Sequence, residues 1–352
     1  MTRALVAIGS LGGTITMTGA EGSGVTPTLG ADDLVAAVPG LERVAALEAT
    51  TLASLPGSSL SFADVFAALR WADAAVAHGA SGVVLIQGTD TLEETAYLLD
   101  LHWSHPEPLV VTGAMRAPGA AGADGPANLL ASVRVAASPL GRSLGVVVVM
   151  NDEVHAAALV RKAHASKLAA FTSPDFGPIG MLIEERLVLG RRPGRWPALQ
   201  APAPGTDPRV VMIDACLGDD GALLRLARSG GFAGAVVSAF GAGHVSFGLA
   251  EAISDAVDGC GDTTGDTTGA QMAVVFASRT GAGTTLGDTY AFNGSERDLI
   301  SRGAVPACWL DPYKARILLW ALLAARASPE GIREEFARRG GAPGGPGGSD
   351  TP

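Results

Sequence analysis

Short apolar runs alternate with helix-like segments along the first half of the chain. In the segment that begins at Phe62, apolar positions recur every three or four residues, which is the spacing of one helix face. Ser61 and Asp64 have the spacing of a capping box at the start of this helix. The alternation predicts an α/β fold with a mostly parallel sheet covered on both faces. The runs that predict buried strands are Ala4–Ile8, Gly82–Ile86, Leu109–Thr112 and Leu144–Met150.

A segment rich in proline, glycine and alanine interrupts this rhythm at residues 187–208. Proline restricts the backbone and cannot donate to a β-ladder, so the segment predicts a linker between two domains. Beyond it, three apolar runs predict further strands at Val210–Ile213, Ala235–Ser238 and Ala273–Ala277. The predicted organisation is a larger N-terminal domain with a mostly parallel sheet (1–186), the linker (187–208), a smaller C-terminal α/β domain (209–339) and a disordered tail (340–352). The duplication GDTTGDTTG at 261–269 predicts a surface loop.

Composition narrows the classes of partner. The 352 residues include 25 Lys+Arg and 35 Asp+Glu, a net charge of −10, whereas nucleic-acid binding needs clustered basic side chains. No apolar stretch reaches the roughly 18 to 20 residues that span a bilayer, and the first residues lack the pattern of a signal peptide. The three cysteines, Cys216, Cys260 and Cys308, are far apart, which suits a reducing cytoplasm and leaves a single disulfide open. We therefore expect a cytoplasmic protein that binds neither nucleic acid nor a membrane.

The first candidate motif, GSLGGTIT at 9–16, follows the first predicted strand. A phosphate-binding loop would need a lysine after its glycines, and a dinucleotide-binding loop would need the spacing GxGxxG. Neither pattern is present. A plain turn and a loop that presents the hydroxyl of Thr14 or Thr16 both remain open at this point.

The second motif, QGTDTLEETA at 87–96, follows the strand predicted at Gly82–Ile86. Gly88 is expected to form the turn, and the spacing of Thr91 and Glu94 predicts a capping box that opens a helix. Thr89 and Asp90 are therefore expected at the carboxyl end of a strand, where open α/β sheets bind ligands. The amides of the helix N-terminus also favour an anion or a developing oxyanion there.

Further strand ends bring other polar residues toward the same edge. VVTGAMR at 110–116 and VVVVMNDEV at 146–154 each end a strand, and Asp124 and Asn128 are expected to be loop or cap residues. Lys162 is a candidate base if it points into this crevice, because a threonine hydroxyl becomes a nucleophile only when a base takes its proton. Threonine, lysine and aspartate together are typical of covalent acyl transfer without metal or cofactor. The histidines show no zinc-binding spacing, and no GxSxG motif is present.

These motifs stand in one order along the chain: GGTIT at 12–16, QGTDTLEETA at 87–96, TGAMR at 112–116, DGPANL at 124–129, MND at 150–152 with Lys162, and DPYKARILL at 311–319. Together they resemble the motifs of the bacterial-type L-asparaginases, in the asparaginase/glutaminase superfamily. The resemblance covers about residues 2–338. The Ala/Gly/Arg-rich composition and GAGHV at 241–245 resemble the actinobacterial cytoplasmic branch most closely.

The resemblance implies hydrolysis of L-asparagine to L-aspartate and ammonia, often with activity on L-glutamine, by a homotetramer whose sites are completed by a neighbouring subunit. It implies that Thr14 is the nucleophile, that Thr89 and Lys162 activate water or relay protons, and that Asp90 binds the substrate ammonium and orients Lys162. No cofactor or metal is implied. The substrate-binding positions implied are Gly13, Ser58, Ser59, Gly88 and Ala114, with Ser58 holding the carboxylate and the carbonyl of Ala114 meeting the amide.

The chain departs from the family pattern at three places. Leu11 replaces the first threonine of TGGTI, Gln87 replaces the histidine of HGTDT, and residues 21–30 lack the tyrosine that the family carries in its mobile loop. Thr26 is a candidate replacement for that hydroxyl. Ser59 stands where a glutamine is common. Two alternatives remain: an amidase for glutamine or another amide, and a catalytically silent homologue that binds a small amino acid.

Overall fold

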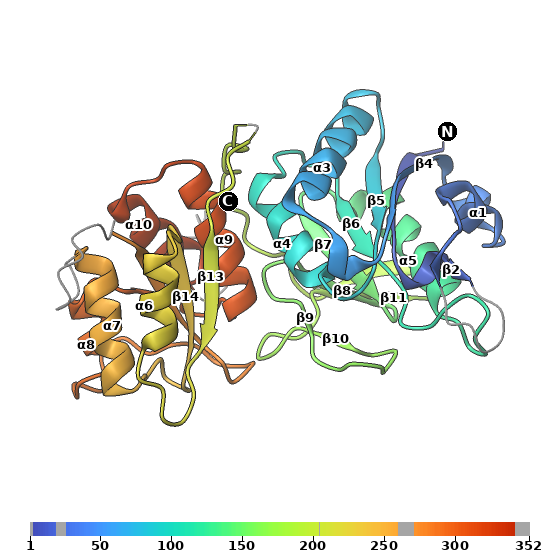
Figure 1. Cartoon of the computed structure of the whole chain (residues 1–352). Coiled ribbons are helices and arrows are strands. Elements are labelled where there is room, and N and C mark those ends of the chain that lie inside the picture. Colours follow the sequence, from blue (N-terminus) through green and yellow to red (C-terminus); the bar gives the residue numbers. More distant parts are fainter. Residues whose placement is uncertain (1–2, 19–25, 204, 260–270, 342–352) are drawn as a thin grey trace. The chain divides into compact units, whose positions relative to one another are not determined.

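The computed structural model describes residues 3–18, 26–203, 205–259 and 271–341 (Figure 1). The duplication at 261–269, residues 21–25 and nearly all of the tail predicted at 340–352 lie outside the described residues. The chain forms two compact units, Met1–Ala198 and Leu199–Pro352. Within the described parts, no helix is both long and apolar enough to cross a membrane.

The first unit contains an eight-stranded sheet of described residues in the order β12-β11-β8-β7-β6-β5-β1-β4. Five neighbouring strands run parallel, namely β7, β6, β5, β1 and β4. At the other edge, β8, β11 and β12 are added in antiparallel pairs. The predicted mostly parallel sheet is therefore confirmed. The strands are β1 (Leu5–Gly12), β4 (Ala46–Leu55), β5 (Gly82–Ile86), β6 (Leu109–Thr112), β7 (Val146–Met150), β8 (Glu153–Ala156), β11 (Gly180–Ile183) and β12 (Arg186–Leu189).

The first strand is longer than its apolar run predicts. The sequence indicated a strand that ends at Ile8, but β1 continues to Gly12 and stays paired with β4. A Cβ atom on Gly9 would lie 2.7 Å from the ring of Trp71. Glycine is therefore needed here inside a strand, because an aromatic ring fills the space of its side chain.

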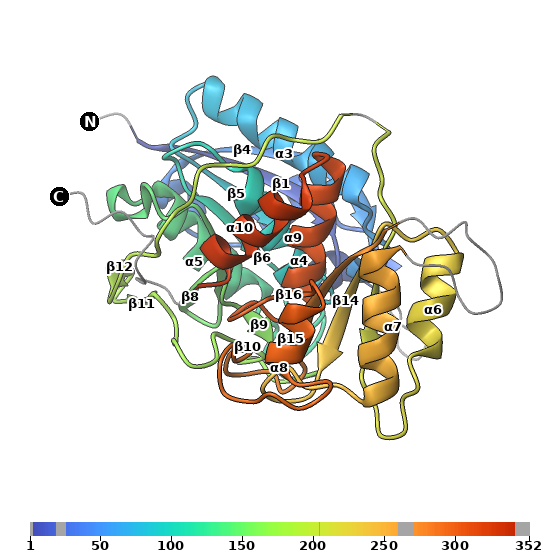
Figure 2. The same ribbon diagram turned by 90° about the vertical axis from the view of Figure 1, so that its left-hand side faces the viewer.

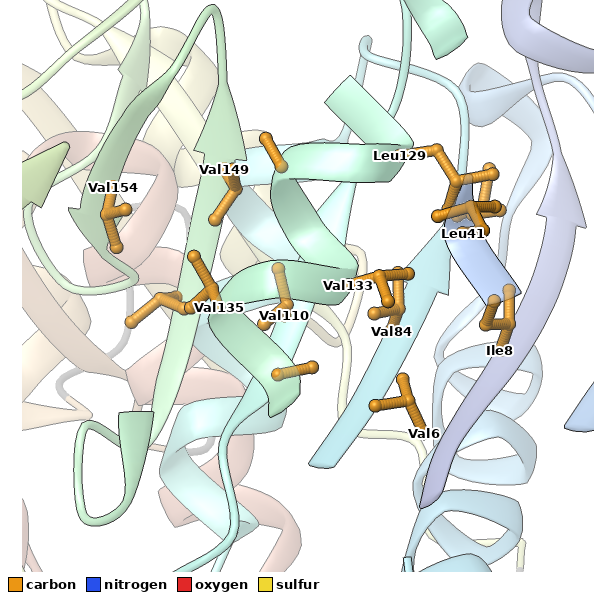
Figure 3. Close-up of a cluster of buried hydrophobic side chains, with 14 of the residues drawn as sticks. Val6, Ile8, Leu41, Val84, Val110, Leu129, Val133, Val135, Val149 and Val154 are labelled. Carbon is orange, nitrogen blue, oxygen red and sulfur yellow. The ribbon is translucent and has the colours of Figure 1, made fainter. Parts of the chain in front are cut away.

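Helices cover both faces of this sheet. On one face, α1 (Ala31–Ala36), α2 (Leu41–Val44) and α5 (Gly125–Ala137) share a hydrophobic core with β1, β5 and β6. Figure 3 shows Val133 of α5 against Val84 of β5. On the other face lie α3 (Phe62–Ala77), which carries Trp71, and α4 (Leu92–His102), which packs on α3. The predicted capping box of Ser61 and Asp64 is present at the start of α3.

The connections after two adjacent strands leave the sheet on opposite faces. The chain leaves β1 toward α1 on one face, and it leaves β5 toward α4 on the other. Such a switch point opens a crevice outside the carboxyl ends of the two strands, where open α/β sheets bind their ligands. The topology therefore places the loop after Gly12 beside the loop after Ile86.

Residues 190–198 end the first unit, and three arginines in this segment donate hydrogen bonds to backbone carbonyls elsewhere in the same unit. Arg191 donates to the carbonyl of Gly177. Arg192 donates to the carbonyls of Leu140 and Arg142. Arg195 donates to the carbonyls of Trp103 and His105. Residues 187–189, expected in the linker, belong to β12. The Pro/Gly-rich composition did not reveal these contacts, since the carbonyls lie between 14 and 92 residues away along the chain.

The second unit is a smaller α/β unit, as predicted, and its described strands form a parallel sheet. Its described strands lie in the order β13-β14-β15-β16. The helices α6, α7 and α8 share the core on one face, whereas α9 packs on the other (Figure 2). The elements are β13 (Val210–Asp214), α6 (Ala222–Ser229), β14 (Gly234–Ala239), α7 (Phe247–Asp258), β15 (Ala273–Ser278), α8 (Glu296–Ser301), β16 (Val305–Pro306), α9 (Pro312–Ala324) and α10 (Pro329–Arg339).

Candidate active site

Four loops at the carboxyl edge of the first sheet touch one another through glycines. A Cβ atom on Gly13 would lie 2.1 Å from the backbone nitrogen of Gly88, and one on Gly57 would lie 2.8 Å from the Gly88 oxygen. A Cβ atom on Gly113 would lie 2.5 Å from the backbone oxygen of Gln87. Any side chain at these positions would push two loops apart. We call Gly13, Gly57, Gly88 and Gly113 the glycine junction.

Each glycine of the junction directly precedes one of the candidate site residues. The loops come from the ends of β1, β4, β5 and β6, so the close backbone contacts gather residues that are distant in the sequence. The residues that follow the glycines are Thr14, Ser58, Thr89 and Ala114. The structure thus brings four of the positions implied by the resemblance to one edge of the sheet.

Thr14 opens a short 3-10 turn, Thr14–Thr16, directly after Gly13. Gly13 has a φ of 90°, a conformation that favours glycine. The hydroxyl of Thr16 is buried and donates to the carbonyl of Gly13 at 2.8 Å. Thr16 therefore stabilises the turn, whereas Thr14 is half-buried at the edge of the sheet.

Thr89, Asp90 and Lys162 form one hydrogen-bonded group. The Lys162 Nζ donates to the Thr89 Oγ1 at 2.9 Å and to the Asp90 Oδ1 at 3.0 Å. Thr89 is buried, whereas 61% of the Asp90 side chain is exposed. A lysine amine in its neutral form can take a proton from a hydroxyl at this distance, and a neighbouring carboxylate fixes its position.

Glu93 of α4 anchors the backbone of Lys162. Lys162 lies on the short strand β9 (Arg161–Lys162), which pairs with β10 (Phe171–Thr172). Its backbone N–H donates to the Glu93 Oε2 at 3.0 Å, and Glu93 is buried. Lys162 is therefore held at its backbone as well as at its amine.

Thr91 corrects one expectation from the sequence. It is the N-cap of α4, but its side chain makes no capping hydrogen bond, so the predicted capping box with Glu94 is wrong. The Thr91 hydroxyl instead donates to the carbonyl of Gly57 at 2.8 Å. A contact across the glycine junction replaces the local cap.

The remaining candidate positions lie in three other segments. Ser58 and Ser59 are exposed in a 3-10 turn, Gly57–Ser59, and join the other loops through Gly57. Ala114 is 1% exposed, and its methyl group packs in the core of the first unit. Thr26 lies in β3 (Thr26–Pro27), paired with β2 (Met17–Thr18).

The sequence interpretation missed Gly57, Gly113 and Glu93. The two glycines had a signal that could have been used, because each precedes a candidate residue in the same way as Gly13 and Gly88. Glu93 had no such signal, since its partner is 69 residues away. Across the described residues, no group of three or more His, Cys, Asp or Glu side chains could hold a metal ion.

Comparison with known protein families gives two matches. The family described as "Asparaginase, N-terminal" matches residues 5–194, and the "Glutaminase/Asparaginase C-terminal domain" matches residues 209–336. The first match contains every candidate site residue. Together the two matches cover most of the chain.

Individual proteins give the same picture. An L-asparaginase of Bacillus licheniformis is 33% identical over 260 residues, which are 73% of this chain and 75% of that protein. A probable L-asparaginase of Deinococcus radiodurans is 33% identical over 90% of this chain and 92% of its own length. The crystal structure of a probable cytoplasmic L-asparaginase from Campylobacter jejuni matches with a TM-score of 0.81 at 29% identity, over 95% of this chain and 99% of that one.

Proposed function

The chain belongs to the asparaginase family and is an asparaginase-type amidohydrolase, and from this premise we propose that it hydrolyses the side-chain amide of L-asparagine to L-aspartate and ammonia. The observation that carries the proposal is the contact of Lys162 with Thr89 and Asp90 beside the loop of Thr14. This group supplies a proton acceptor on the Thr89 hydroxyl, in a loop that contacts the loop of Thr14 through Gly88 and Gly13.

In the proposed mechanism, the hydroxyl of Thr14 attacks the amide carbon and forms a tetrahedral intermediate. The Thr14 proton passes to the departing nitrogen, the C–N bond breaks, and ammonia leaves an ester on Thr14. Thr89 and Lys162 then take a proton from a water molecule, which attacks the ester. As the bond to Thr14 breaks and aspartate leaves, that proton passes to the Thr14 oxygen and restores its hydroxyl. Asp90 orients Lys162 and binds the ammonium group of the substrate.

The backbone of the glycine junction is suited to bind the reacting group. Gly13 and Gly88 allow close approach, and the N–H groups of the two threonine loops are the proposed donors to the oxyanion. In the same proposal, Ser58 and Ser59 hold the substrate carboxylate, and the carbonyl of Ala114 accepts from the amide. Such preorganised donors are worth about two to three orders of magnitude in rate.

The test is ammonia release from L-asparagine by the wild type, Thr14→Ala and Thr14→Ser. We expect Thr14→Ala to lose several orders of magnitude in kcat while still binding L-aspartate in calorimetry, because only the nucleophile is removed. Thr14→Ser keeps a hydroxyl and should retain part of the activity. Wild-type turnover in Thr14→Ala would refute the role of Thr14.

A second candidate is hydrolysis of L-glutamine, which the description of the C-terminal domain family favours. The ratio of kcat/KM for the two amides decides between the candidates. The silent amino-acid-binding alternative is disfavoured, because a protein that only binds an amino acid has no need of a lysine on a threonine hydroxyl. Release of ammonia from neither amide, with L-asparagine still bound, would restore that alternative.

We also propose a cytoplasmic homo-oligomer, either a dimer or a tetramer. The location rests on the Campylobacter jejuni neighbour, which is described as cytoplasmic. The assembly rests on the family resemblance of the motifs. Light scattering on the purified chain would test the assembly, and a monomer that is fully active would refute it.

A further inference from the structure

Asp124 stands at the start of α5, but its carboxylate serves another segment. It occupies the N-cap position without making a capping hydrogen bond. Its Oδ2 accepts from the backbone N–H of Met115 and its Oδ1 from that of Arg116, both at 2.9 Å. These two residues directly follow Ala114. The charge at the helix start therefore holds the loop after β6.

Asn128, one turn further along α5, holds the same loop from its other side. Its Nδ2 donates to the carbonyl of Gly113 and to the Asp124 Oδ2, each at 3.0 Å. Its Oδ1 accepts from the backbone N–H of Asn151 at 2.9 Å, and the side chain is 2% exposed. Asp124 and Asn128 thus form a pair whose hydrogen bonds lead mainly to backbone.

The two contacts fix the peptide groups on both sides of Ala114. In a trans peptide, the N–H and the C=O point in opposite directions. Because the Met115 N–H points at Asp124, the carbonyl of Ala114 points away from α5. Because the Gly113 carbonyl points at Asn128, the N–H of Ala114 also points away from α5. Both polar backbone groups of Ala114 are therefore oriented by these two side chains.

The start of α5 also touches the turn of Thr14. A Cβ atom on Gly125 would lie 2.7 Å from the Cγ1 of Ile15 and 3.5 Å from the Cβ of Ala114. One helix start therefore packs against the residue after Thr14 and against Ala114 itself. A shift of this helix start would change the distance between the two loops.

We propose that Asp124 and Asn128 are positioning residues for amide hydrolysis, which orient the backbone of Ala114 toward the substrate amide in register with Thr14. The inference rests on the proposed function. The pair acts through Ala114 and does not touch the substrate. A misplacement of about 1 Å in such a site costs on the order of 100-fold in rate.

The test compares Asp124→Ser, Asp124→Asn and the matched control Asp100→Ser. Serine is as good an N-cap as aspartate, but its short side chain cannot accept from both loop amides. The variant therefore removes the contact with the loop and keeps a good N-cap residue at the start of the helix. Asparagine keeps one acceptor oxygen and serves as the conservative rescue. The Asp100 Oδ1 accepts from the backbone N–H of Val146 at 3.1 Å, at the amino end of β7 in the same sheet.

For Asp124→Ser we expect kcat on L-asparagine to fall about 10-fold to 100-fold, with KM changed less than about threefold. Amide hydrogen exchange at Met115 and Arg116 should become at least about tenfold faster. Asp124→Asn should lie between this variant and the wild type in both measurements. Asp100→Ser should leave kcat and both exchange rates unchanged.

Two results would overturn the inference while leaving the proposed function intact. One is wild-type kcat in Asp124→Ser despite faster exchange, and the other is unchanged exchange at Met115 and Arg116. A wild type that releases no ammonia from asparagine or glutamine would instead refute the proposed function, and with it the catalytic part of this inference.

Discussion

The carboxyl edges of the two sheets differ in the contacts that bring their loops together. In the first unit the loops meet at the glycine junction, backbone against backbone. In the second unit the loops after β14 and β15 meet around a buried carboxylate, that of Glu296. It accepts from the backbone N–H of Thr289 and Tyr290 and bonds the His244 Nε2 at 3.1 Å.

The difference shows what a reactive edge requires beyond its topology. In the second unit, Glu296 is itself fully buried and committed to the loops, and His244 packs edge-on against Tyr290 and Phe292. In the first unit the closest contacts between the loops are backbone contacts at the glycine junction, with side chains such as Thr91 and Asp124 beside them. At the same edge the Lys162 Nζ donates to the Thr89 hydroxyl. Convergence of strand ends is common to both edges. Glycine contacts leave polar side chains available for chemistry.

The largest effect is expected from adding a methyl group to the glycine junction. Gly13→Ala forces a Cβ to within 2.1 Å of Gly88 at an unfavourable φ, and we expect at least about a 1,000-fold loss of kcat/KM and a lower melting temperature. Gly241→Ala, after β14, is the matched control, because a Cβ there meets nothing within 4 Å. Its unfolding free energy should change by less than about 0.5 kcal/mol. Near-normal activity of Gly13→Ala would break the comparison.

A smaller effect is expected from replacing either of two lysines that form ion pairs with aspartates. Lys162→Met should lower kcat by about 100-fold to 1,000-fold with little loss of stability, since its partner Asp90 is largely exposed. Lys314 of α9 is buried, and its Nζ lies 2.6 Å from the Asp311 Oδ2. Lys314→Met should therefore lower the unfolding free energy by about 3 to 5 kcal/mol and leave kcat unchanged. Chemical denaturation and steady-state rates on both variants measure the contrast. The reverse pattern would contradict it.

The smallest effect is expected from a fall in pH, which should destabilise the first unit at a higher pH than the second. Burial lowers the pKa of His155 on β8 to about 4, against an unfolded value of about 6.5. The unfolded chain therefore binds the proton more readily, and stability is lost as pH falls from about 6.5 to about 4. Full protonation of the folded protein at His155 therefore costs at most about 3.4 kcal/mol of unfolding free energy. Glu153, whose Oε2 lies 3.3 Å from the His155 Nε2, should reduce this loss.

The second unit is expected to respond at lower pH. Burial alone would raise the pKa of Glu296, but the hydrogen bonds from Tyr290, His244 and Thr289 outweigh burial and lower it below 4.5. Its stabilisation is therefore present above about pH 4.5 and is lost only as the pH falls further. Hydrogen exchange of peptides from each unit at pH 7, 5.5 and 4.5 measures the order. His155→Gln should flatten the response of the first unit, and loss of the second unit first would contradict the comparison.

The sequence predicts the strands and helices of the first unit well, because these elements depend on local patterns of apolar residues. Apolar runs at β5 and β7 and helical spacing after Phe62 are sufficient for the parallel sheet. The resemblance of the motifs also named Lys162 as a partner of Thr89, and the structure joins them. The extension of β1 to Gly12 and the Glu93 anchor were not predictable, because both depend on residues distant in sequence.

The glycine junction also limits how this protein can diversify. Each of four neighbouring positions accepts only the smallest residue, so a mutational library directed at Gly13, Gly57, Gly88 or Gly113 should return almost no folded, active clones. Ser58 and Ser59 are exposed and carry no such constraint. Laboratory evolution of a new amide preference should therefore accumulate its changes at that serine pair, with the glycines unchanged.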